Sequence, residues 1–357
     1  MESTPNRIPS LDGLRTVSIA LVVLGHFFHV IGLGQSGNLG NLGVRVFFVI
    51  SGFLITGLLV KEMDKTSTIG LLKFYFRRTL RIFPPYYFFL LIILIASLDQ
   101  DIFVRLRSLF FAAAYATDYI NPANWYLGHT WSLAVEEQFY LILPGVLLLL
   151  GIRRSKIFLL FIVACLPVIR VMDFHLSGPD QMWVLKGFHA NMDALAIGCL
   201  LTLFRTTLQN NSVYKRFLAS PVVALLPVVI MIFNVQYEHP NLFYGVSISV
   251  MNISIALCID WTVTNYTSVA GRVLNSSPFV TLGGMSYSIY LWQQPFFNPE
   301  NTAAWARFPL NLVGLTVMTL ISYFVVERYS LKLRHKWETR FFGAKKPVAA
   351  DQLGFAG

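Results

Sequence analysis

The sequence has few charges and few cysteines for its length. Charged residues make up only 13% of its 357 positions, whereas soluble globular proteins carry about 25%. So few charges cannot cover a water-exposed surface, which excludes a soluble cytosolic protein. The apolar content of 55% also excludes a disordered chain. Because lipid tolerates an apolar exterior, the composition indicates a polytopic membrane protein.

Several common signatures are missing as well. Cys165, Cys199 and Cys258 stand singly in apolar stretches, without the spacing of metal or redox sites, so we interpret them as small apolar residues and expect no metal site. The sequence has no GxSxG, P-loop or Rossmann motif that would indicate a soluble enzyme. The first apolar run, from Thr16, contains two histidines and no following small-residue cleavage site, so it does not resemble a cleavable signal peptide.

Long apolar runs are what the sequence does have. Runs of about 17 to 25 residues, long enough to cross a bilayer as helices, predict an all-α bundle with about ten transmembrane helices. An eleventh run, 103–116, is short and carries two arginines, and we expect a buried or interfacial helix there. Residues 1–336 are predicted to form the membrane domain and residues 337–357 a mobile cytoplasmic tail. The predicted spans are 15–33, 43–60, 82–98, 131–150, 157–173, 188–205, 220–236, 245–263, 280–298 and 309–327.

The distribution of basic residues predicts the orientation, because such residues collect in cytoplasmic loops. Loops 61–81 and 151–156 hold six and three of them, so an even number of spans must lie between these loops. This parity is why run 103–116 is not counted. With ten spans, both termini are cytoplasmic and 22 of the 28 basic residues lie on the cytoplasmic side. The net charge of +10 is then a topological signal, and we expect a multi-pass inner (plasma) membrane protein in contact with lipid, without a nucleic-acid partner.

The first span carries a polar stripe. Arg15 and His26 are eleven residues apart, which places them on one face of a helix and about 16 Å apart along its axis. Asp12 and His29 extend the stripe in both directions. Ionisable groups inside a membrane are costly and are functional hypotheses by default. A neutral imidazole is suited to act as a base or a nucleophile there. The alternative is an interhelical hydrogen-bonded histidine.

Two further segments carry charge next to or inside predicted spans. Arg78 and Arg81 are neighbours on a helix, and two adjacent guanidinium groups can clamp a phosphate or pyrophosphate. The alternative is a positive-inside signal alone. In segment 131–140, Glu136 and Glu137 project about 100° apart, so at least one needs a partner inside the bundle.

The possible partners of these glutamates are the two intramembrane arginines, Arg45 and Arg170. A buried ion pair that fixes helix register is the structural alternative to a functional role for the glutamates. Ser132, Asp193 and Glu327 are the other polar residues that we expect in the bundle.

Taken together, these segments resemble the acyltransferase-3 family of integral membrane acyltransferases. The matching segments follow the family's order from residue 8 to about residue 330, so the resemblance covers nearly the whole chain. Each is modest alone, and their order on ten predicted spans makes the set specific. The segments are 11–15 with His26, 44–55, 78–81, 131–140, 192–198, 282–295 and 322–327.

The resemblance implies a ten-helix enzyme that uses acyl-CoA from the cytoplasm as a co-substrate and binds no permanent cofactor. Arg15 and His26 match the family's essential pair. Arg78 and Arg81 match its arginine pair, which is assigned to the CoA phosphates, and Glu136 matches the glutamate of its Trp-Ser-Leu segment.

Two positions depart from the family pattern. Gln293 stands where many members carry His, and Asn191 stands where many carry Arg. Both departures concern contacts with the acceptor, while Arg15 and His26 follow the pattern.

The function expected from the sequence is therefore O-acylation, with acetyl as the expected group and a hydroxyl of an exopolysaccharide, lipopolysaccharide or other glycan as the acceptor. Acyl-CoA would dock on Arg78 and Arg81, and Glu136 would orient or activate the acceptor. His26 would act as a general base or as a nucleophile, and the sequence leaves both routes open. The alternative is a transporter or flippase of a polar lipid-linked saccharide, which also needs intramembrane charges, although no internal repeat is evident.

Overall fold

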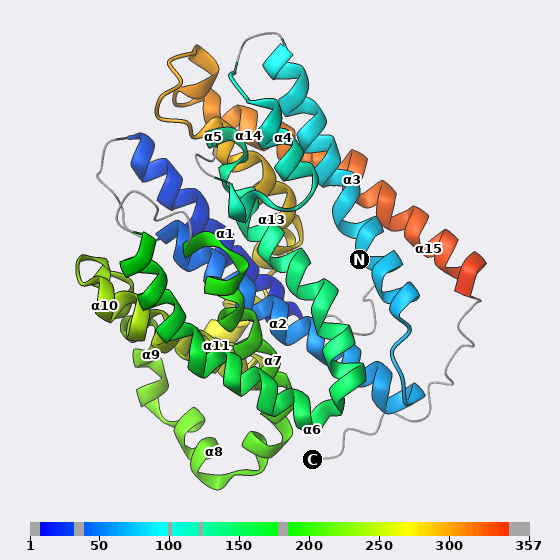
Figure 1. Cartoon of the computed structure of the whole chain (residues 1–357), viewed down its shortest axis with the longest axis vertical. Coiled ribbons are helices and arrows are strands. Elements are labelled where there is room, and N and C mark those ends of the chain that lie inside the picture. Colours follow the sequence, from blue (N-terminus) through cyan, green and yellow to red (C-terminus); the bar gives the residue numbers. More distant parts are fainter. Residues whose placement is uncertain (1–7, 32–38, 99–101, 121–123, 178–184, 343–357) are drawn as a thin grey trace.

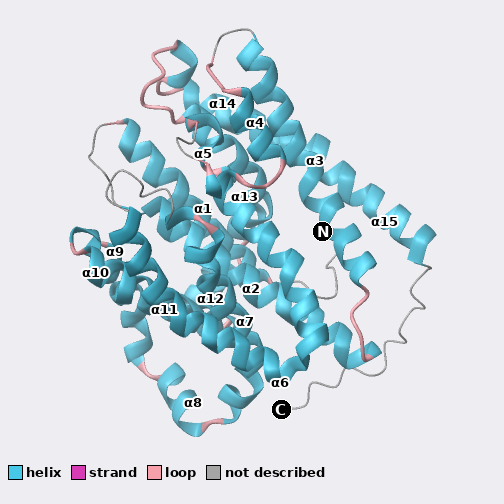
Figure 2. Ribbon diagram, in the orientation of Figure 1, coloured by secondary structure: helices cyan, strands magenta, loops and turns pink. Residues whose placement is uncertain are grey.

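The computed structural model describes residues 8–31, 39–98, 102–120, 124–177 and 185–342 (Figure 1). Every regular element in these ranges is a helix (Figure 2), which confirms the all-α prediction. The longer helices are α1 (Pro9–Val30), α2 (Leu39–Thr66), α3 (Leu71–Leu98), α6 (Thr130–Ser177), α7 (Phe188–Asn210), α9 (Leu226–Asn234), α11 (Ile248–Thr264), α13 (Ser277–Phe296), α14 (Leu310–Ile321) and α15 (Arg328–Phe342).

Short helices connect the long ones or extend them. Two are π-helical, η5 (Phe243–Ser247) before α11 and η7 (Ser322–Glu327) between α14 and α15. The others are α4 (Leu106–Ala113), η1 (Thr117–Tyr119), α5 (Trp125–Gly128), α8 (Ser212–Ala219), η3 (Pro221–Leu225), η4 (Gln236–Glu238), α10 (Pro240–Leu242), α12 (Val269–Leu274) and η6 (Ala304–Ala306).

Six described helices are long and apolar enough to cross a membrane, or seven if the bent pair formed by α8 and the segment 221–234 is one span. One of the six, 125–177, contains two predicted spans, because α6 is broken at Gly151. There φ is 66° and ψ is 169°, a backbone conformation that only glycine adopts readily. Each of the ten predicted spans coincides with helix, apart from residues 32 and 33, which lie outside the described ranges, and short segments at other span ends. The number of spans and their orientation stay predictions.

The short run 103–116 contains α4, whose eight residues extend about 12 Å, far less than the hydrocarbon core of a bilayer. This agrees with the expectation of a helix that does not span. At the other end of the chain, α15 continues past residue 336 to Phe342. The remainder of the predicted tail, 343–357, lies outside the described residues.

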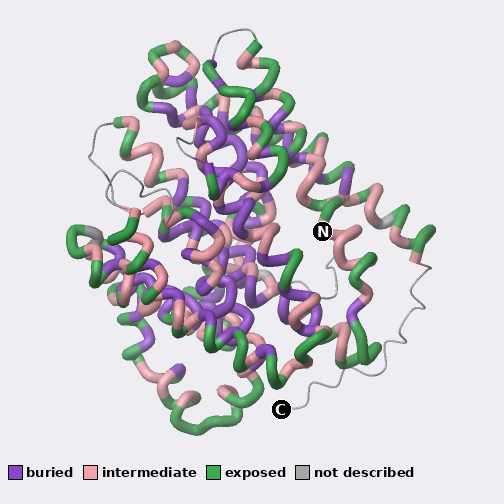
Figure 3. Tube along the Cα trace, viewed as in Figure 1, coloured by how far each residue is buried: buried purple, intermediate pink, exposed green. Residues whose placement is uncertain are grey.

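Large apolar side chains on the outside of the bundle fit a lipid environment. Leu149, Leu176 and Leu72 are 84%, 80% and 76% exposed, values that water would penalise and hydrocarbon would not. Buried residues are concentrated along the centre of the bundle (Figure 3). The chain therefore has the apolar exterior that its composition predicts.

Three glycines set the close helix packing that positions the site. A Cβ at Gly52 on α2 would collide with the carbonyl of Leu195 on α7, and one at Gly198 on α7 would collide with the carbonyl of Val49. A Cβ at Gly283 on α13 would likewise meet the carbonyl of Asp12 on α1. Small residues let helix backbones approach in this way inside membranes. These contacts bring α2 against α7 and α13 against the part of α1 that carries Arg15.

Candidate active site

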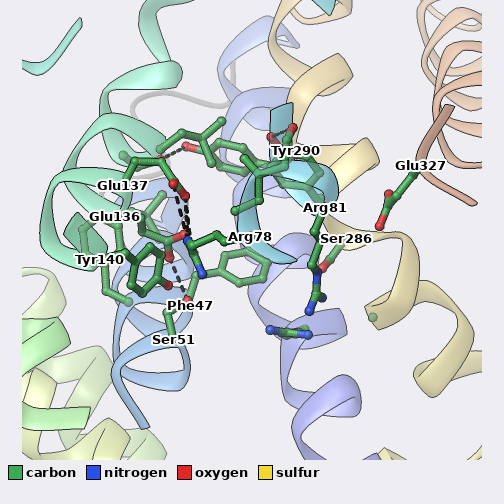
Figure 4. Close-up of a pocket in the computed structure, with 18 of the residues that line it drawn as sticks. Phe47, Ser51, Arg78, Arg81, Glu136, Glu137, Tyr140, Ser286, Tyr290 and Glu327 are labelled. Carbon is green, nitrogen blue, oxygen red and sulfur yellow. Dashed lines mark hydrogen bonds and ion pairs between the residues drawn. The ribbon is translucent and has the colours of Figure 1, made fainter. Parts of the chain in front are cut away.

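A cavity of about 140 Å³ lies between α1, α2, α3, α6, α13 and η7 (Figure 4). Its wall contains three arginines and three glutamates, together with serine and tyrosine hydroxyls and apolar residues of α2. Such a concentration of charge inside an apolar bundle marks a binding or catalytic site rather than a packing interface. The charged residues in the wall are Arg15, Arg78, Arg81, Glu136, Glu137 and Glu327.

The cavity brings together six of the residues that the sequence singled out, from four different elements. Arg15 comes from α1, the two predicted arginines from α3, and Glu327 from the end of η7. Glu136 and Ser132 come from α6. Asp12, His26, His29 and Asp193 are not in its wall.

Arg78 and Glu137 form an ion pair in the cavity wall. The Arg78 Nη2 donates to Glu137 Oε1 over 2.9 Å and its Nε donates to the same oxygen over 3.1 Å. The guanidinium carbon of Arg78 also lies 3.1 Å from the centroid of the Tyr140 ring. The charge of Arg78 is therefore compensated and one face of its guanidinium is covered.

Glu137 finds its partner on α3 and not in either of the two arginines that the sequence offered as possible partners. It pairs with Arg78, because side chains of α3 reach the part of α6 that precedes Gly151. Arg170, in the part of α6 that follows Gly151, instead donates to Asp193 Oδ2 over 2.7 Å, with both side chains fully buried. The Nη1 atom of Arg45 is buried without a hydrogen bond to any described residue.

Arg81 differs from Arg78 although it is only three residues away. Its guanidinium lines the cavity, is exposed, and forms no hydrogen bond or salt bridge with the described residues. Figure 4 shows Arg81 extending away from the Arg78–Glu137 pair, on the side of the cavity where Glu327 lies. Arg15, in the same cavity, has Asp12 at 3.5 Å. Arg81 is the guanidinium best able to bind an anion here.

Two carboxylates on separate walls retain free acceptor capacity. Ser51 Oγ donates to Glu136 Oε1 over 2.8 Å, and Ser288 Oγ donates to Glu327 Oε2 over 3.0 Å. Neither carboxylate has a cation within salt-bridge distance among the described residues. Glu327 also closes the π-helical turn η7, a type of distortion that is frequent at functional sites.

His26 lies three turns further along α1 than Arg15 and outside the cavity wall. Its ring is edge-on to the Trp125 ring, with 6.2 Å between centroids, and the His29 ring stacks on Trp125 at 6.1 Å. The His26 Nδ1 lies 3.0 Å from the carbonyl oxygen of Val22, an arrangement in which an Nδ1–H donates. The Nε2 atom is then the lone-pair nitrogen, which a base or nucleophile requires.

Polar groups lie between the cavity and the His26 region. Ser132 and Tyr290 both line the cavity, and their hydroxyl oxygens are 2.6 Å apart. Tyr290 also donates to the carbonyl oxygen of His129 over 2.9 Å, and its ring is 5.5 Å from the His129 ring. The stripe predicted along α1 is thus divided between the cavity, which holds Arg15, and a second polar region, which holds the histidines.

The two departures from the family pattern lie outside the cavity wall. Asn191 donates from Nδ2 to the carbonyl oxygens of Leu185 and Gly187, which fixes the turn before α7. Gln293 on α13 is fully buried, and neither atom of its amide has a hydrogen-bond partner among the described residues.

Sequence reasoning did not single out Ser51, Tyr140, Tyr287 or Tyr290 as site residues. A usable signal existed for Tyr140, which is four residues after Glu136 and so shares its helix face. Tyr287 lies near the point where Pro84 and Pro85 interrupt the hydrogen bonds of α3, and its hydroxyl donates to the carbonyl of Ile82 over 3.1 Å. Within the described residues, no three His, Cys, Asp or Glu side chains are grouped so that they could hold a metal ion.

Comparison with known proteins identifies the family. The acyltransferase-3 family model, described as an acyltransferase domain, matches residues 8–328. O-acetyltransferase OatA of Staphylococcus aureus strain NCTC 8325 / PS 47 is 30% identical over 312 residues, which are 82% of this chain and 51% of that protein. The putative O-acetyltransferase SACOL0978 of S. aureus strain COL is 31% identical over 306 residues, or 80% of this chain and 50% of that protein.

The chain thus spans about half the length of the relatives it matches. No solved structure matches it. Its resemblance to the family, first evident in the segments around Arg15, Arg78 and Glu136, is confirmed by a match that covers nearly all of the described bundle. The chain belongs to the acyltransferase-3 family.

Proposed function

We propose that this protein is a membrane O-acetyltransferase that moves an acetyl group from cytoplasmic acetyl-CoA to a hydroxyl of a saccharide. The observation that carries the proposal is the cavity inside an apolar bundle whose wall holds Arg81, which has no hydrogen bond or salt bridge among the described residues, together with Glu136 and Glu327. The names of the relatives support the acetyl group, and the family match supports acyl transfer. The acceptor is a glycan of the cell surface or a lipid-linked precursor of one.

The proposed topology has ten spans in the inner membrane, with both termini in the cytoplasm. The helices that coincide with the predicted spans and the break at Gly151 support it. In this orientation the start of α3 lies on the cytoplasmic side, and Arg81 lies nearly three turns further along the helix. The donor therefore enters from the cytoplasm along α3, and the histidines of α1 lie nearer the outer face.

In the proposed donor complex, Arg81 and Arg15 bind the phosphates of CoA. Arg78 shapes the wall instead, because Glu137 and Tyr140 already occupy its guanidinium. The thioester then points toward Glu136 and the hydroxyls of Ser132 and Tyr290. This assignment divides the predicted arginine clamp into one binding arginine and one structural arginine.

In the transfer step, the acceptor oxygen forms a bond to the acetyl carbonyl carbon while the bond from that carbon to sulfur breaks. The acceptor proton passes to His26 Nε2, and the departing CoA thiolate takes this proton from the imidazolium, which returns His26 to its neutral form. In the alternative route, His26 Nε2 attacks the thioester carbonyl carbon and expels the CoA thiolate. The acceptor hydroxyl then attacks the acetyl-imidazolium, the neutral imidazole leaves, and the hydroxyl proton neutralises the thiolate. Glu136, held by Ser51, orients the acceptor or the thioester in either route.

The proposal is tested with membranes that contain the protein and acetyl-CoA labelled in the acetyl group. We expect label to enter extracted glycan, and we expect Arg81→Ala to abolish most of this transfer. Arg154→Gln, at an exposed arginine in the predicted cytoplasmic turn beside Gly151, is the matched control and should transfer normally. Movement of a saccharide across the membrane without any acetyl transfer would instead support a transporter or flippase.

A further inference from the structure

The first half of α3 carries a basic row that the sequence analysis did not identify. Lys73, Arg77 and Arg81 are spaced four residues apart, so they follow one another along one side of the helix at steps of about 6 Å. Arg78 lies off this row and faces Glu137. The row leads from the beginning of α3 into the cavity, where Arg81 is its last member.

Helix α15 packs along this row. Glu338 forms salt bridges with Arg77 and, over 3.8 Å, with Lys73. The Phe76 ring contacts the rings of Phe341 and Phe342, with centroids 6.2 and 5.6 Å away. Figure 1 shows α15 beside α3 at the edge of the molecule. We call the patch made by Lys73, Arg77 and the facing residues of α15 the rim; it adjoins the cavity through Arg81, the next member of the row.

The charges at this rim do not balance. Arg334, one helical turn before Glu338 on α15, interacts electrostatically with both Arg77 and Arg81. Lys73 and Arg77 thus share the single carboxylate of Glu338, and Arg334 adds a third cation close to it. The side chains of Lys73 and Arg77 are 27% and 35% exposed, so a ligand can reach them. An accessible surplus of positive charge next to an anion-binding cavity favours a ligand with several negative charges.

We propose that Lys73, Arg77 and Arg334 form a second anion site for the 3′-phosphorylated adenosine end of the donor, with Glu338 as the counter-charge that the phosphate displaces. This inference rests on the proposed function, in which Arg81 and Arg15 bind the donor's diphosphate. In CoA the 3′-phosphate and the diphosphate are attached to the same ribose, so their binding sites must be neighbours. Arg77 is one helical turn from Arg81, and that placement meets this requirement.

The experiment compares CoA with dephospho-CoA, which lacks only the 3′-phosphate, by titration calorimetry on the purified full chain in detergent. We expect the wild type to bind CoA about tenfold more tightly, because the 3′-phosphate adds charge-assisted hydrogen bonds. Arg77→Gln should weaken CoA binding to near the level of dephospho-CoA and leave dephospho-CoA binding unchanged. Glu338→Gln should strengthen CoA binding, since a competing carboxylate is removed. Lys332→Gln, at an exposed lysine of α15, is the control and should preserve the preference.

Several outcomes would overturn the inference. Equal binding of the two ligands by the wild type would show that the rim does not recognise the 3′-phosphate. If Arg77→Gln weakened both ligands equally, the residue would have a structural role only. If it weakened binding to vesicles of anionic lipid while the preference for CoA remained, the rim would bind lipid headgroups. In each of these cases acetyl transfer would persist, whereas absence of both CoA binding and acetyl transfer in the wild type would contradict the proposed function itself.

Discussion

Arg78 and Glu137 pair across the cavity wall at 2.9 Å, while Arg81, one helical turn away on α3, has no hydrogen bond or salt bridge among the described residues. This difference gives two arginines of one motif different tasks. Arg78 fixes α3 against α6, and Arg81 remains able to bind an anion. The two tasks can be separated by mutation.

We predict that Arg78→Ala destabilises the protein by about 1–3 kcal/mol, because it leaves the partly buried carboxylate of Glu137 without its partner. The double variant Arg78→Ala/Glu137→Gln should recover most of this loss. Arg81→Ala should leave stability nearly unchanged and weaken CoA binding by at least about tenfold, since it removes a charge-assisted contact with phosphate. Thermal unfolding in detergent and CoA titration measure the two effects. A stable Arg78→Ala protein that had lost CoA binding would contradict this division of roles.

Ser51 should act through Glu136. Its hydroxyl donates to Glu136 Oε1, so Ser51→Ala leaves the carboxylate free to rotate in the cavity. We predict a several-fold lower kcat for acetyl transfer with an unchanged KM for acetyl-CoA, and a larger fall in kcat for Glu136→Gln. Ser51→Thr keeps the hydroxyl and should restore most of the rate. An increase in KM alone would place Ser51 in the donor site instead.

The buried pair of Arg170 and Asp193 should be structural. Both side chains are fully buried, and Arg170 also donates to the carbonyl of Tyr244 over 3.0 Å and to Ser249 Oγ over 3.0 Å. Asp193→Ala removes one partner and should lower the free energy of unfolding by about 3–5 kcal/mol. The protein that still folds should transfer acetyl groups at a normal rate per folded molecule, measured after size-exclusion purification. A stable but inactive Asp193→Ala protein would contradict this and give Asp193 a role in the reaction.

Asp118 should make stability depend on pH. This residue of η1 lies outside the candidate spans, and burial raises the pKa of its carboxyl to about 6. Because the folded-state pKa is above the unfolded value, the stabilisation is present at pH 4 and is lost as the pH rises toward 6. Asp118→Asn keeps an oxygen for the Phe188 amide but replaces the oxygen that accepts from Gln138 Nε2 with an amide nitrogen. We predict that the melting temperature of this variant rises relative to that of the wild type between pH 4 and pH 7. A constant difference across this range would contradict the prediction.

Much of the site could be predicted from the sequence because charge is rare in this chain. Arg15, Arg81 and Glu136 are conspicuous in apolar surroundings, and the structure places them in one cavity. The partner of Glu137 could not be predicted, since the sequence does not show that side chains of α3 reach the part of α6 that precedes Gly151. The separate directions of Arg78 and Arg81 could not be predicted either. A spacing of three residues on a helix leaves their side chains only about 60° apart, which suggests one shared face.

The surroundings of His26 were the other feature that could not be predicted from the sequence. Helical spacing places His26 on the same face as Arg15, but it does not show which neighbouring helices line each end of that face. In the structure the Arg15 end lies against α3, α13 and η7, whereas the His26 end lies against Trp125. The role of His26 in catalysis is therefore a prediction, and both proposed routes of acetyl transfer depend on it.

The most direct test of the account is acetyl transfer by His26→Ala in membranes, with labelled acetyl-CoA and with protein amounts matched by immunoblotting. We predict that transfer to glycan is abolished while CoA binding remains within about twofold of the wild type, because Arg81 and Arg15 are untouched. His29→Ala, at the neighbouring histidine that stacks on Trp125, is the matched control and should retain most of the transfer. Transfer at the wild-type rate by His26→Ala would contradict the central claim that this imidazole handles the proton or the acetyl group.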